Sequence, residues 1–261
     1  MASPTLSTKG LISVVIPTLN EQFGIKKTIS SIPRSQIRDE LGYELEILVV
    51  DGNSSDSTAQ VASKIGARVI IEKRRGYGRA YKTGFAASKG EIIVTIDADD
   101  TYPASQIPQY IRQLVQQDLD FITINRFAKM ERNSMDFTRR SGNRLLALVL
   151  RLLYSINLKD SQSGMWIMKS RFLSQINIYS DEMSMSEEIK IIAFKFFNSK
   201  EMDGTYFART GSTKLDIIED GWQNLKYLFQ YRKKIKSALK SAKHREEQGM
   251  YLHPTSARKD S

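Results

Sequence analysis

Short apolar runs alternate with segments of helical character through the first half of the chain. The runs are apolar throughout instead of alternating with polar residues, which is typical of strands buried on both faces. They cover residues 11–16, 45–50, 69–71, 91–96 and 121–124. Because strands that alternate with helices need crossover connections, the pattern predicts an α/β fold with a mostly parallel sheet and helices on both faces.

Helices are expected between these runs and through the less regular second half. They cover residues 21–32, 56–65, 78–88, 103–117, 143–154, 186–197 and 222–243, with a further strand at 165–168. In the last helix, apolar residues such as Trp222, Leu228 and Phe229 are expected mostly on one side, with lysines opposite. The expected division is a Rossmann-like domain over 11–215, a basic amphipathic helical region over 216–245, and flexible tails at 1–10 and 246–261.

Positive charge is concentrated in two segments of the chain. The 261 residues include 39 lysines and arginines against 29 acids, which gives a formal net charge of +10. Residues 222–261 hold ten of these cations and three acids, and residues 126–151 hold seven and two. A solvated basic surface is the usual interpretation of a charge run. Because two separate segments share the bias, a common anionic partner is the alternative hypothesis.

Several classes of site and location are disfavoured by what the sequence lacks. Without cysteine there is no disulfide framework and no thiolate metal site. The only histidines, His244 and His253, lie near the C-terminus, so histidine-based catalysis is not expected. No apolar run approaches the roughly 20 residues of a spanning helix, and residues 1–10 lack the apolar core of a secretion signal. The chemistry is therefore expected to use carboxylates, cations and a metal.

Acidic residues follow three of the predicted strands directly. They are Glu21, Asp51 and the pair in Asp97-Ala98-Asp99. In open parallel sheets, ligands bind beyond the carboxyl ends of the strands. Carboxylates there can accept hydrogen bonds from a base and ribose, or hold a hard divalent cation that neutralises a diphosphate. Most Asp-x-Asp pairs are surface turns, but the position directly after a buried strand favours a ligand site.

The segment Gly76-Tyr77-Gly78 resembles part of a dinucleotide-binding fingerprint, but two features exclude that interpretation. It follows the third predicted strand instead of the first, and Tyr81 occupies the position of the last glycine or alanine. The remaining interpretations are a flexible loop that starts a helix, or a close backbone approach to a ligand near Arg79. The second is favoured.

Taken in order, these motifs resemble the family 2 glycosyltransferases of the GT-A fold, and in particular the polyprenyl-phosphate sugar synthases such as the dolichyl-phosphate mannose synthases. The resemblance runs from about residue 12 to residue 215. The matching segments are Val-Ile-Pro-Thr-Leu-Asn-Glu at 15–21, Val-Asp-Gly-Asn-Ser-Ser-Asp-Ser-Thr at 50–58, Gly-x-Gly-x-Ala-x-x-x-Gly at 76–84, Asp-Ala-Asp at 97–99, Asp-Ser-Gln-Ser-Gly at 160–164 and Arg-Thr-Gly-Ser-Thr-Lys-Leu at 209–215.

The resemblance implies a metal-dependent, inverting transfer of a sugar from a nucleotide-sugar to dolichyl or polyprenyl phosphate. The implied nucleotide-sugar site is Pro17, Leu19, Glu21, Asp51, Asp97, Ala98, Asp99, Arg209 and Lys214. The implied metal ligands for Mg2+ or Mn2+ are Asp99 and Asp97. The implied acceptor-phosphate site is Arg126, Arg139, Arg140, Arg144 and Ser163. The implied catalytic residues are Asp99, Arg126, Arg139 and Arg209, and Glu187 or Glu188 corresponds to an acidic helix start.

The identity of the donor stays open at this point. Leu19, Gly52 and Thr101 stand where the mannose synthases usually have other residues. Some similar archaeal enzymes use UDP-glucose or UDP-N-acetylglucosamine instead of GDP-mannose. All three nucleotide-sugars are therefore retained.

A phosphate acceptor agrees with a site that lacks histidine. A sugar hydroxyl needs a general base, whereas a phosphate monoester is already anionic at neutral pH, with a second pKa of about 6. Arginine suits this acceptor because its guanidinium binds phosphate bidentately. The leucine-rich segment 145–153 either lines the lipid path or is a core helix. Residues 222–243 either lie on anionic head groups or pack on the domain with a wet basic face.

The expected partners are a nucleotide-sugar, a lipid phosphate and a membrane surface, with a membrane-anchored partner protein left open. The expected location is the cytoplasmic face of a membrane, or the cytoplasm. One alternative is a family 2 glycosyltransferase with a soluble glycan or protein acceptor and Glu187 or Glu188 as base. A non-catalytic nucleic-acid binder would use the basic segments but would leave the strand-end acids unexplained, so nucleic acid is not an expected partner.

Overall fold

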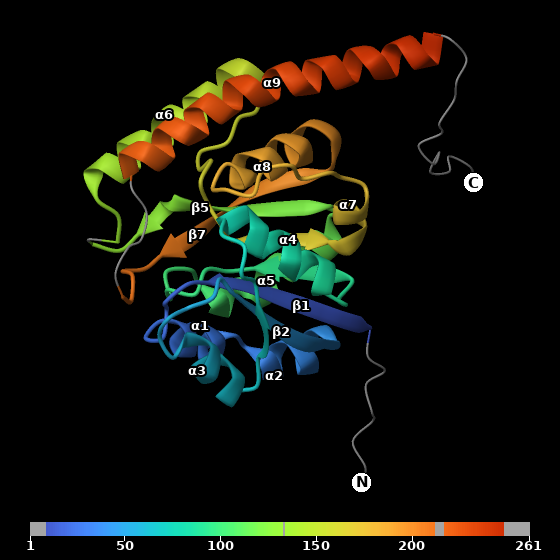
Figure 1. Ribbon diagram of the computed structural model, residues 1–261. Helices are drawn as coiled ribbons and strands as arrows, with labels where there is room; N and C mark the ends of the chain where they lie inside the picture. Colours follow the sequence, from blue (N-terminus) through green and yellow to red (C-terminus); the bar gives the residue numbers. More distant parts are fainter. Residues whose placement is uncertain (1–8, 133, 212–216, 248–261) are drawn as a thin grey trace, which may run out of the picture.

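A twisted sheet in the order β3-β2-β1-β4-β6-β5-β7 forms the centre of the computed structural model (Figure 1). The structure describes residues 9–132, 134–211 and 217–247. Its strands are β1 (Gly10–Thr18), β2 (Tyr43–Asp51), β3 (Arg68–Ile71), β4 (Ile92–Thr95), β5 (Phe121–Met130), β6 (Trp166–Lys169) and β7 (Ser199–Tyr206). Strand β6 runs antiparallel to β4 and β5, and the other neighbours are parallel. The carboxyl ends of β1, β2, β4 and β5 therefore meet at one edge.

Helices cover both faces of this sheet, as the alternation of strands and helices predicts. The helices are α1 (Ile25–Ser31), α2 (Arg34–Gln36), α3 (Thr58–Lys64), α4 (Tyr77–Ala87), α5 (Ile107–Gln116), α6 (Phe137–Tyr154), α7 (Ser170–Ser174), α8 (Met185–Phe196) and α9 (Ile217–Glu247), with a π-helical turn η1 (Ile37–Leu41) and a 3-10 turn η2 (Ala104–Gln106). Along β1, Val14 and Ile16 belong to the core shared with α1, α3 and α5, whereas Val15 belongs to the core shared with α4, α7 and α8. Residues alternate between the two faces because the side-chain period of a strand is two.

Helices α6 and α9 form a further layer over α8 (Figure 1). A third apolar cluster joins them, in which Leu150 of α6 and Leu228 of α9 pack with Ile191 of α8. The hydroxyl of Tyr154 donates a hydrogen bond of 2.5 Å to the Leu228 carbonyl. The leucine-rich segment is thus a packed helix on one side, and its other side is exposed.

The structure extends or reorients several of the expected elements. The strand expected at 121–124 continues to Met130, and the helix expected at 143–154 begins at Phe137. Asp136 caps that helix by accepting a hydrogen bond of 2.8 Å from the Arg139 backbone N–H. Of the expected tails, residues 1–8 and 248–261 lie outside the described residues, while Gly10 begins β1 and α9 runs to Glu247.

The expected arrangement of residues 222–243 is wrong in one respect. Leu228 is buried against the domain, whereas Trp222 and Phe229 are 70% and 51% exposed and share the outer side of α9 with Lys226. A helix has three to four residues per turn, so positions 222, 226 and 229 fall on one side. None of the helices in the described part of the chain is long and apolar enough to cross a membrane.

Candidate active site

The acidic residues that follow β1, β2 and β4 lie at the shared carboxyl edge of the sheet. Glu21, Asp51 and Asp99 are 8%, 1% and 5% exposed, so all three carboxylates are removed from bulk water. The Glu21 backbone N–H donates to the hydroxyl of Thr58 at 2.8 Å, which ties the loop after β1 to the start of α3. Burying a carboxylate is costly without hydrogen-bond partners, so the partners of each one indicate its role.

Asp51 has one satisfied and one unsatisfied oxygen. Its Oδ1 accepts a hydrogen bond of 2.6 Å from the Ser54 backbone N–H, whereas its Oδ2 is buried without a partner. Pro17 is buried at the end of β1, and Leu19 beside it is 46% exposed. An unpaired buried acceptor next to an exposed apolar side chain suits a flat ring that carries N–H or O–H donors.

Arg209 connects two of the carboxylates. Its Nη1 lies 2.6 Å from Oδ2 of Asp99, and its Nη2 pairs with Oε1 of Glu21. Asp99 is fixed from its other side by the Thr101 hydroxyl, which donates to Oδ1 at 2.7 Å. The Thr210 backbone N–H also donates to the Asp99 carbonyl at 2.9 Å. The structure therefore brings Glu21, Asp99 and Arg209 together as the resemblance implies, and Lys214 lies outside the described residues.

Asp97 lies beside this group and is held by a tyrosine that the sequence analysis did not single out for this role. The Tyr77 hydroxyl donates to Oδ1 of Asp97 at 3.2 Å. Burial, and secondly the neighbouring Asp99 carboxylate, raise the pKa of Asp97 to about 7. A Cβ at Gly164 would lie 2.5 Å from the Tyr77 hydroxyl and 2.9 Å from Oδ1 of Asp97, so a side chain here would displace these groups. Tyr77 lies inside the Gly-x-Gly motif at 76–78, and this motif was the sequence signal that could have pointed to it.

Asp97 and Asp99 fit the donor set of a hard divalent cation that is completed by substrate. Within the described ranges, no group of three or more histidines, cysteines or acids could hold a metal by itself. Mg2+ is commonly bound by one or two carboxylates together with substrate phosphates. The two aspartates therefore match a cation that arrives with a diphosphate, and Arg209 would have to leave Oδ2 of Asp99 if that oxygen became a ligand.

A buried ion pair lies behind the site. Nε and Nη2 of Arg126 lie 2.7 and 2.8 Å from the two carboxylate oxygens of Asp160, which is fully buried. Burial opposes ionisation of Asp160, but the Arg126 guanidinium outweighs it and lowers the pKa of Asp160. Arg126 also stacks on Tyr206, with 5.3 Å between its guanidinium carbon and the ring centre. Arg126 therefore has a structural partner in Asp160, and it also lies near the site.

Lys190 of α8 holds the loop at 160–164 in place through hydrogen bonds to its backbone. The sequence analysis did not identify this lysine. Its fully buried ammonium donates to the carbonyls of Ser161 and Ser163 at 2.6 and 2.7 Å and to the Ser186 hydroxyl at 3.0 Å. Burial lowers the pKa of Lys190 to about 7. A lysine inside the apolar stretch 189–194 was the signal that could have marked it.

The two acids at the start of α8 have different environments. Glu188 accepts hydrogen bonds of 2.9 Å from the backbone N–H groups of Tyr179 and Ser180, and one of 2.7 Å from the Tyr227 hydroxyl of α9. Glu187 is fully buried, and Gln162 donates to its Oε1 while Oε2 has no partner. Burial raises the pKa of Glu187 to about 8. Glu188 therefore has a structural role, and Glu187 is the more reactive candidate of the two.

The arginines expected to hold the acceptor phosphate lie near the start of α6. Nε of Arg139 lies 3.3 Å from Oδ2 of Asp136. Nε of Arg140 is buried without a partner, and Arg144 is exposed one turn further along. Ser163 is fully buried, so the structure does not expose it together with these arginines.

The glycines at 76 and 78 approach the protein itself. A Cβ at Gly76 would lie 2.2 Å from the Asp181 carbonyl oxygen, and one at Gly78 would lie 2.7 Å from that of Ser180. Arg79 pairs with the Asp181 side chain. The loop at 180–181 therefore occupies the space where side chains at these two positions would lie, and the expected close approach to a ligand stays a prediction.

Two known proteins match about four-fifths of this chain in sequence. The chain is 32% identical over 211 residues to a dolichyl-phosphate hexose transferase of Haloferax volcanii, which covers 80% of this chain and 89% of that protein. It is 31% identical over 220 residues to the low-salt glycan biosynthesis hexosyltransferase Agl6 of the same organism, covering 83% of this chain but only 52% of Agl6.

A solved structure of similar fold is glucosyl-3-phosphoglycerate synthase from Mycobacterium tuberculosis in complex with Mn2+, UDP-glucose and phosphoglyceric acid. Its TM-score is 0.67 and its sequence identity 22%, over 86% of this chain and 80% of that one. The same enzyme is also known in complex with Mg2+ and UDP. The α/β, GT-A fold expected from the sequence is confirmed.

The family profile described as Glycosyl transferase family 2 matches residues 13–176, more than half of the chain. This range begins within β1, includes β2 to β6 and contains the carboxylates at the ends of β1, β2 and β4. The protein is a glycosyltransferase, and the chain belongs to glycosyl transferase family 2.

Proposed function

We propose that the protein transfers a hexose from a nucleotide-sugar to a lipid monophosphate of the dolichyl or polyprenyl type, with inversion at the anomeric carbon. The observation that carries the proposal is the group of Asp97, Asp99 and Arg209 at the sheet edge, in a chain whose helix α6 has arginines in its first turns and one exposed apolar side. The name of the Haloferax relative supports a dolichyl-phosphate acceptor.

The donor would be held by groups from three strand ends. Oδ2 of Asp51 would accept a hydrogen bond from the base or ribose, next to Leu19. Asp97 and Asp99 would hold Mg2+ or Mn2+, and the complexes of glucosyl-3-phosphoglycerate synthase with these ions support this. Such a cation neutralises the charge that develops on a departing diphosphate. Arg209, and Lys214 five positions later in the sequence, would add positive charge to that group.

The acceptor would approach from the start of α6. Its phosphate is already anionic at neutral pH and therefore needs positioning instead of a general base. Arg139, Arg140 and Arg144 offer guanidinium groups for this, with Arg126 behind them. A cytoplasmic membrane surface is where such a lipid would be presented, with or without a membrane-anchored partner protein.

The assay that tests the proposal combines purified protein, Mg2+ or Mn2+ and detergent-dispersed dolichyl phosphate with GDP-mannose, UDP-glucose or UDP-N-acetylglucosamine in turn. We expect one of these donors to give a lipid-linked sugar, detected by mass spectrometry. Transfer to a soluble glycan or peptide, with no lipid-linked product from any donor, would contradict the proposal and favour the soluble-acceptor alternative.

Two arginines at the start of α6 should separate acceptor from donor binding. The double variant Arg139→Ala with Arg140→Ala is expected to raise KM for the lipid phosphate by about tenfold or more, because each charge-assisted contact contributes about 1.5–3 kcal/mol. KM for the nucleotide-sugar should change little. Steady-state kinetics with each substrate varied in turn measures the difference. The matched control is Arg34→Ala with Arg38→Ala, two exposed arginines in α2 and η1, which lie on the other face of the sheet from α6 (Figure 1). Equal changes in both KM values would remove these arginines from the acceptor site.

Glu187 discriminates between the two kinds of acceptor. Its unpaired Oε2 is the observation that favours a hydroxyl acceptor with a carboxylate base. If the acceptor is a phosphate, Glu187→Gln should leave kcat within a few-fold of the wild type, whereas loss of a general base costs on the order of 10²-fold or more. We expect the small effect, measured as kcat at saturating lipid phosphate. A large loss that grows as pH rises through about 8, where Glu187 would ionise, would identify it as the base.

A further inference from the structure

Helix α6 has two apolar sides. Leu146, Leu150 and Tyr154 are buried in the cluster shared with α8 and α9. A second apolar row points away from the domain, because its spacing of three, four and eight residues keeps it on one side of the helix. Its members are Phe137, Leu145, Leu148 and Leu152, which are 81%, 53%, 49% and 70% exposed. Single exposed apolar residues are common on surfaces, but an ordered row marks an interaction site.

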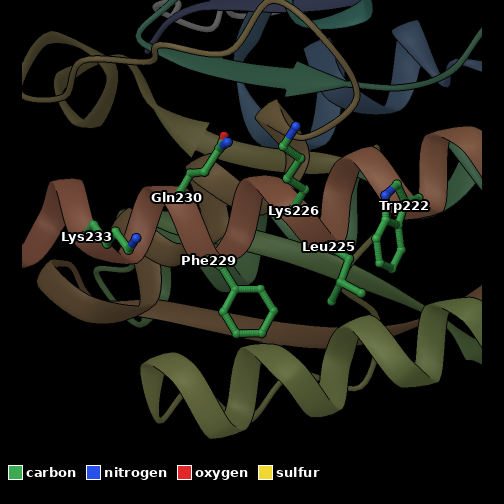
Figure 2. Close-up of a pocket in the computed structure, with 6 residues that line it drawn as sticks. All are labelled: Trp222, Leu225, Lys226, Phe229, Gln230 and Lys233. Carbon is green, nitrogen blue, oxygen red and sulfur yellow. The ribbon is translucent and has the colours of Figure 1, made fainter.

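Helix α9 continues this surface. Trp222 and Phe229 are exposed on its outer side, and with Leu225 they point toward α6 (Figure 2). These residues line an open groove of about 270 Å³ along α9. Since α6 and α9 pack side by side, their outward apolar residues lie on one surface. We call it the outer face of α6 and α9, and it consists of Phe137, Leu145, Leu148, Leu152, Trp222 and Phe229.

Positive charge predominates on the outer face. Its exposed cations include Arg144, Arg151, Lys226 and Lys233. The sequence contains no acid between residues 137 and 154 or between 221 and 235, and the exposed acids Asp136 and Glu219 lie just before these two segments. An apolar face with tryptophan and a basic border has the composition of helices that lie in the interface of an anionic bilayer. A second copy of the chain would bring cations against cations in a twofold contact, which is unfavourable.

We infer that the outer face of α6 and α9 docks on the surface of a membrane that contains anionic lipids. This inference rests on the proposed function for its biological purpose, but its geometry is independent of it. Phe137 begins α6, and Arg139 and Arg140 follow in the same turn. Docking through this face therefore places the arginines proposed for the acceptor phosphate next to the lipid head groups, with the carboxylates of the sheet edge behind them.

Vesicle binding by the full chain tests the inference, without donor or metal. Trp222 is exposed and the other tryptophan, Trp166, is fully buried, so Trp222 reports contact with lipid. Vesicles of phosphatidylcholine with phosphatidylglycerol should shift its fluorescence to shorter wavelength, and brominated lipid should quench it. Vesicles of phosphatidylcholine alone should bind more weakly, and salt should weaken binding to the anionic ones.

The decisive variant is Leu148→Glu with Leu152→Glu. Both side chains already contact water, so the unfolding temperature should stay close to that of the wild type, while vesicle binding should fall by about tenfold or more. The matched control is Val115→Glu, an equally exposed apolar residue of α5 on the other side of the sheet, which should bind as the wild type does.

Three outcomes would overturn the inference. They are no binding of the wild type to anionic vesicles, wild-type binding by the double variant, and a dimer in sedimentation velocity that the double variant dissociates, since this would make the face an interface between copies. Sugar transfer to detergent-dispersed lipid phosphate is measured separately. If sugar transfer fails, the proposed function is contradicted but vesicle binding remains a valid result. If vesicle binding fails, the docking inference is overturned but sugar transfer to dispersed lipid remains a valid result.

Discussion

Exchange of Asp99 for asparagine should lower kcat by on the order of 10³-fold, which is the expected scale when charge stabilisation of a transition state is removed. Asparagine has nearly the same shape, and its carbonyl oxygen can still accept the 2.7 Å hydrogen bond of the Thr101 hydroxyl. What is lost is the negative charge that pairs with Arg209 and that would bind the cation. The measurement is kcat with saturating dolichyl phosphate and nucleotide-sugar over a series of Mn2+ concentrations.

A second readout separates metal binding from catalysis. Free Mn2+ measured by electron paramagnetic resonance, in the presence of GDP or UDP, should show weaker Mn2+ binding in Asp99→Asn. Asp100→Asn is the matched control, because Asp100 is the next residue along the chain. Its backbone N–H donates a hydrogen bond of 3.0 Å to the Thr28 hydroxyl, and this bond does not depend on its side chain. Wild-type turnover and Mn2+ affinity in Asp99→Asn would exclude Asp99 as a metal ligand.

Loss of the buried carboxylate at position 160 should have the largest effect on stability. Asp160→Asn leaves the Arg126 guanidinium buried without a counter-charge, which typically costs about 3–5 kcal/mol of unfolding free energy. The double variant Arg126→Met with Asp160→Leu should recover much of this loss, since replacing both charges by apolar groups is often close to neutral. Urea unfolding curves of the wild type, Arg126→Met, Asp160→Leu and the double variant measure the coupling of the pair, and the curve of Asp160→Asn measures the loss of the charge alone.

Activity of the double variant then tests the second role of Arg126. If the double variant is stable and still transfers sugar with unchanged KM for the lipid, Arg126 is not part of the acceptor site.

The stability contributed by Asp160 should depend on pH with a defined sign. Because the pKa of Asp160 is lowered in the folded state, its contribution is present at neutral pH and is lost as pH falls through the folded pKa. The difference in stability between the wild type and Asp160→Asn should therefore shrink in acid, where the wild-type carboxyl is protonated too.

The sheet and its covering helices could be predicted because their signals are local. The apolar run before Asp97 and the polar turn after it occur within ten residues, and strand period and turn chemistry act on that scale. The same locality placed Asp51 and Asp99 at strand ends. The contact of Arg209 with Glu21, 188 residues apart, was not predicted, because the resemblance to a family implied only that both residues belong to the nucleotide-sugar site.

The parts that escaped prediction depend on packing between distant segments. Lys190 reaches the carbonyl of Ser161 29 residues earlier, and no periodicity encodes that contact. The packing of the glycines at 76 and 78 could not be predicted for a similar reason, since the loop that fills the space beside them comes about 100 residues later. In α9, both sides carry apolar residues, so the pattern alone could not decide which side faces the domain.

Helix α8 gives the molecule a mechanical connection between its outer layer and the sheet edge. Glu188 receives the Tyr227 hydroxyl of α9, and Ile191 packs in the cluster with α6. Between them, Lys190 holds the loop whose Gly164 lies directly against Asp97. The contact that fixes α9 and the contact that fixes the loop beside Asp97 are thus made by neighbouring residues within one turn of α8. The position of the outer layer and the position of that loop therefore depend on the same short segment of the molecule.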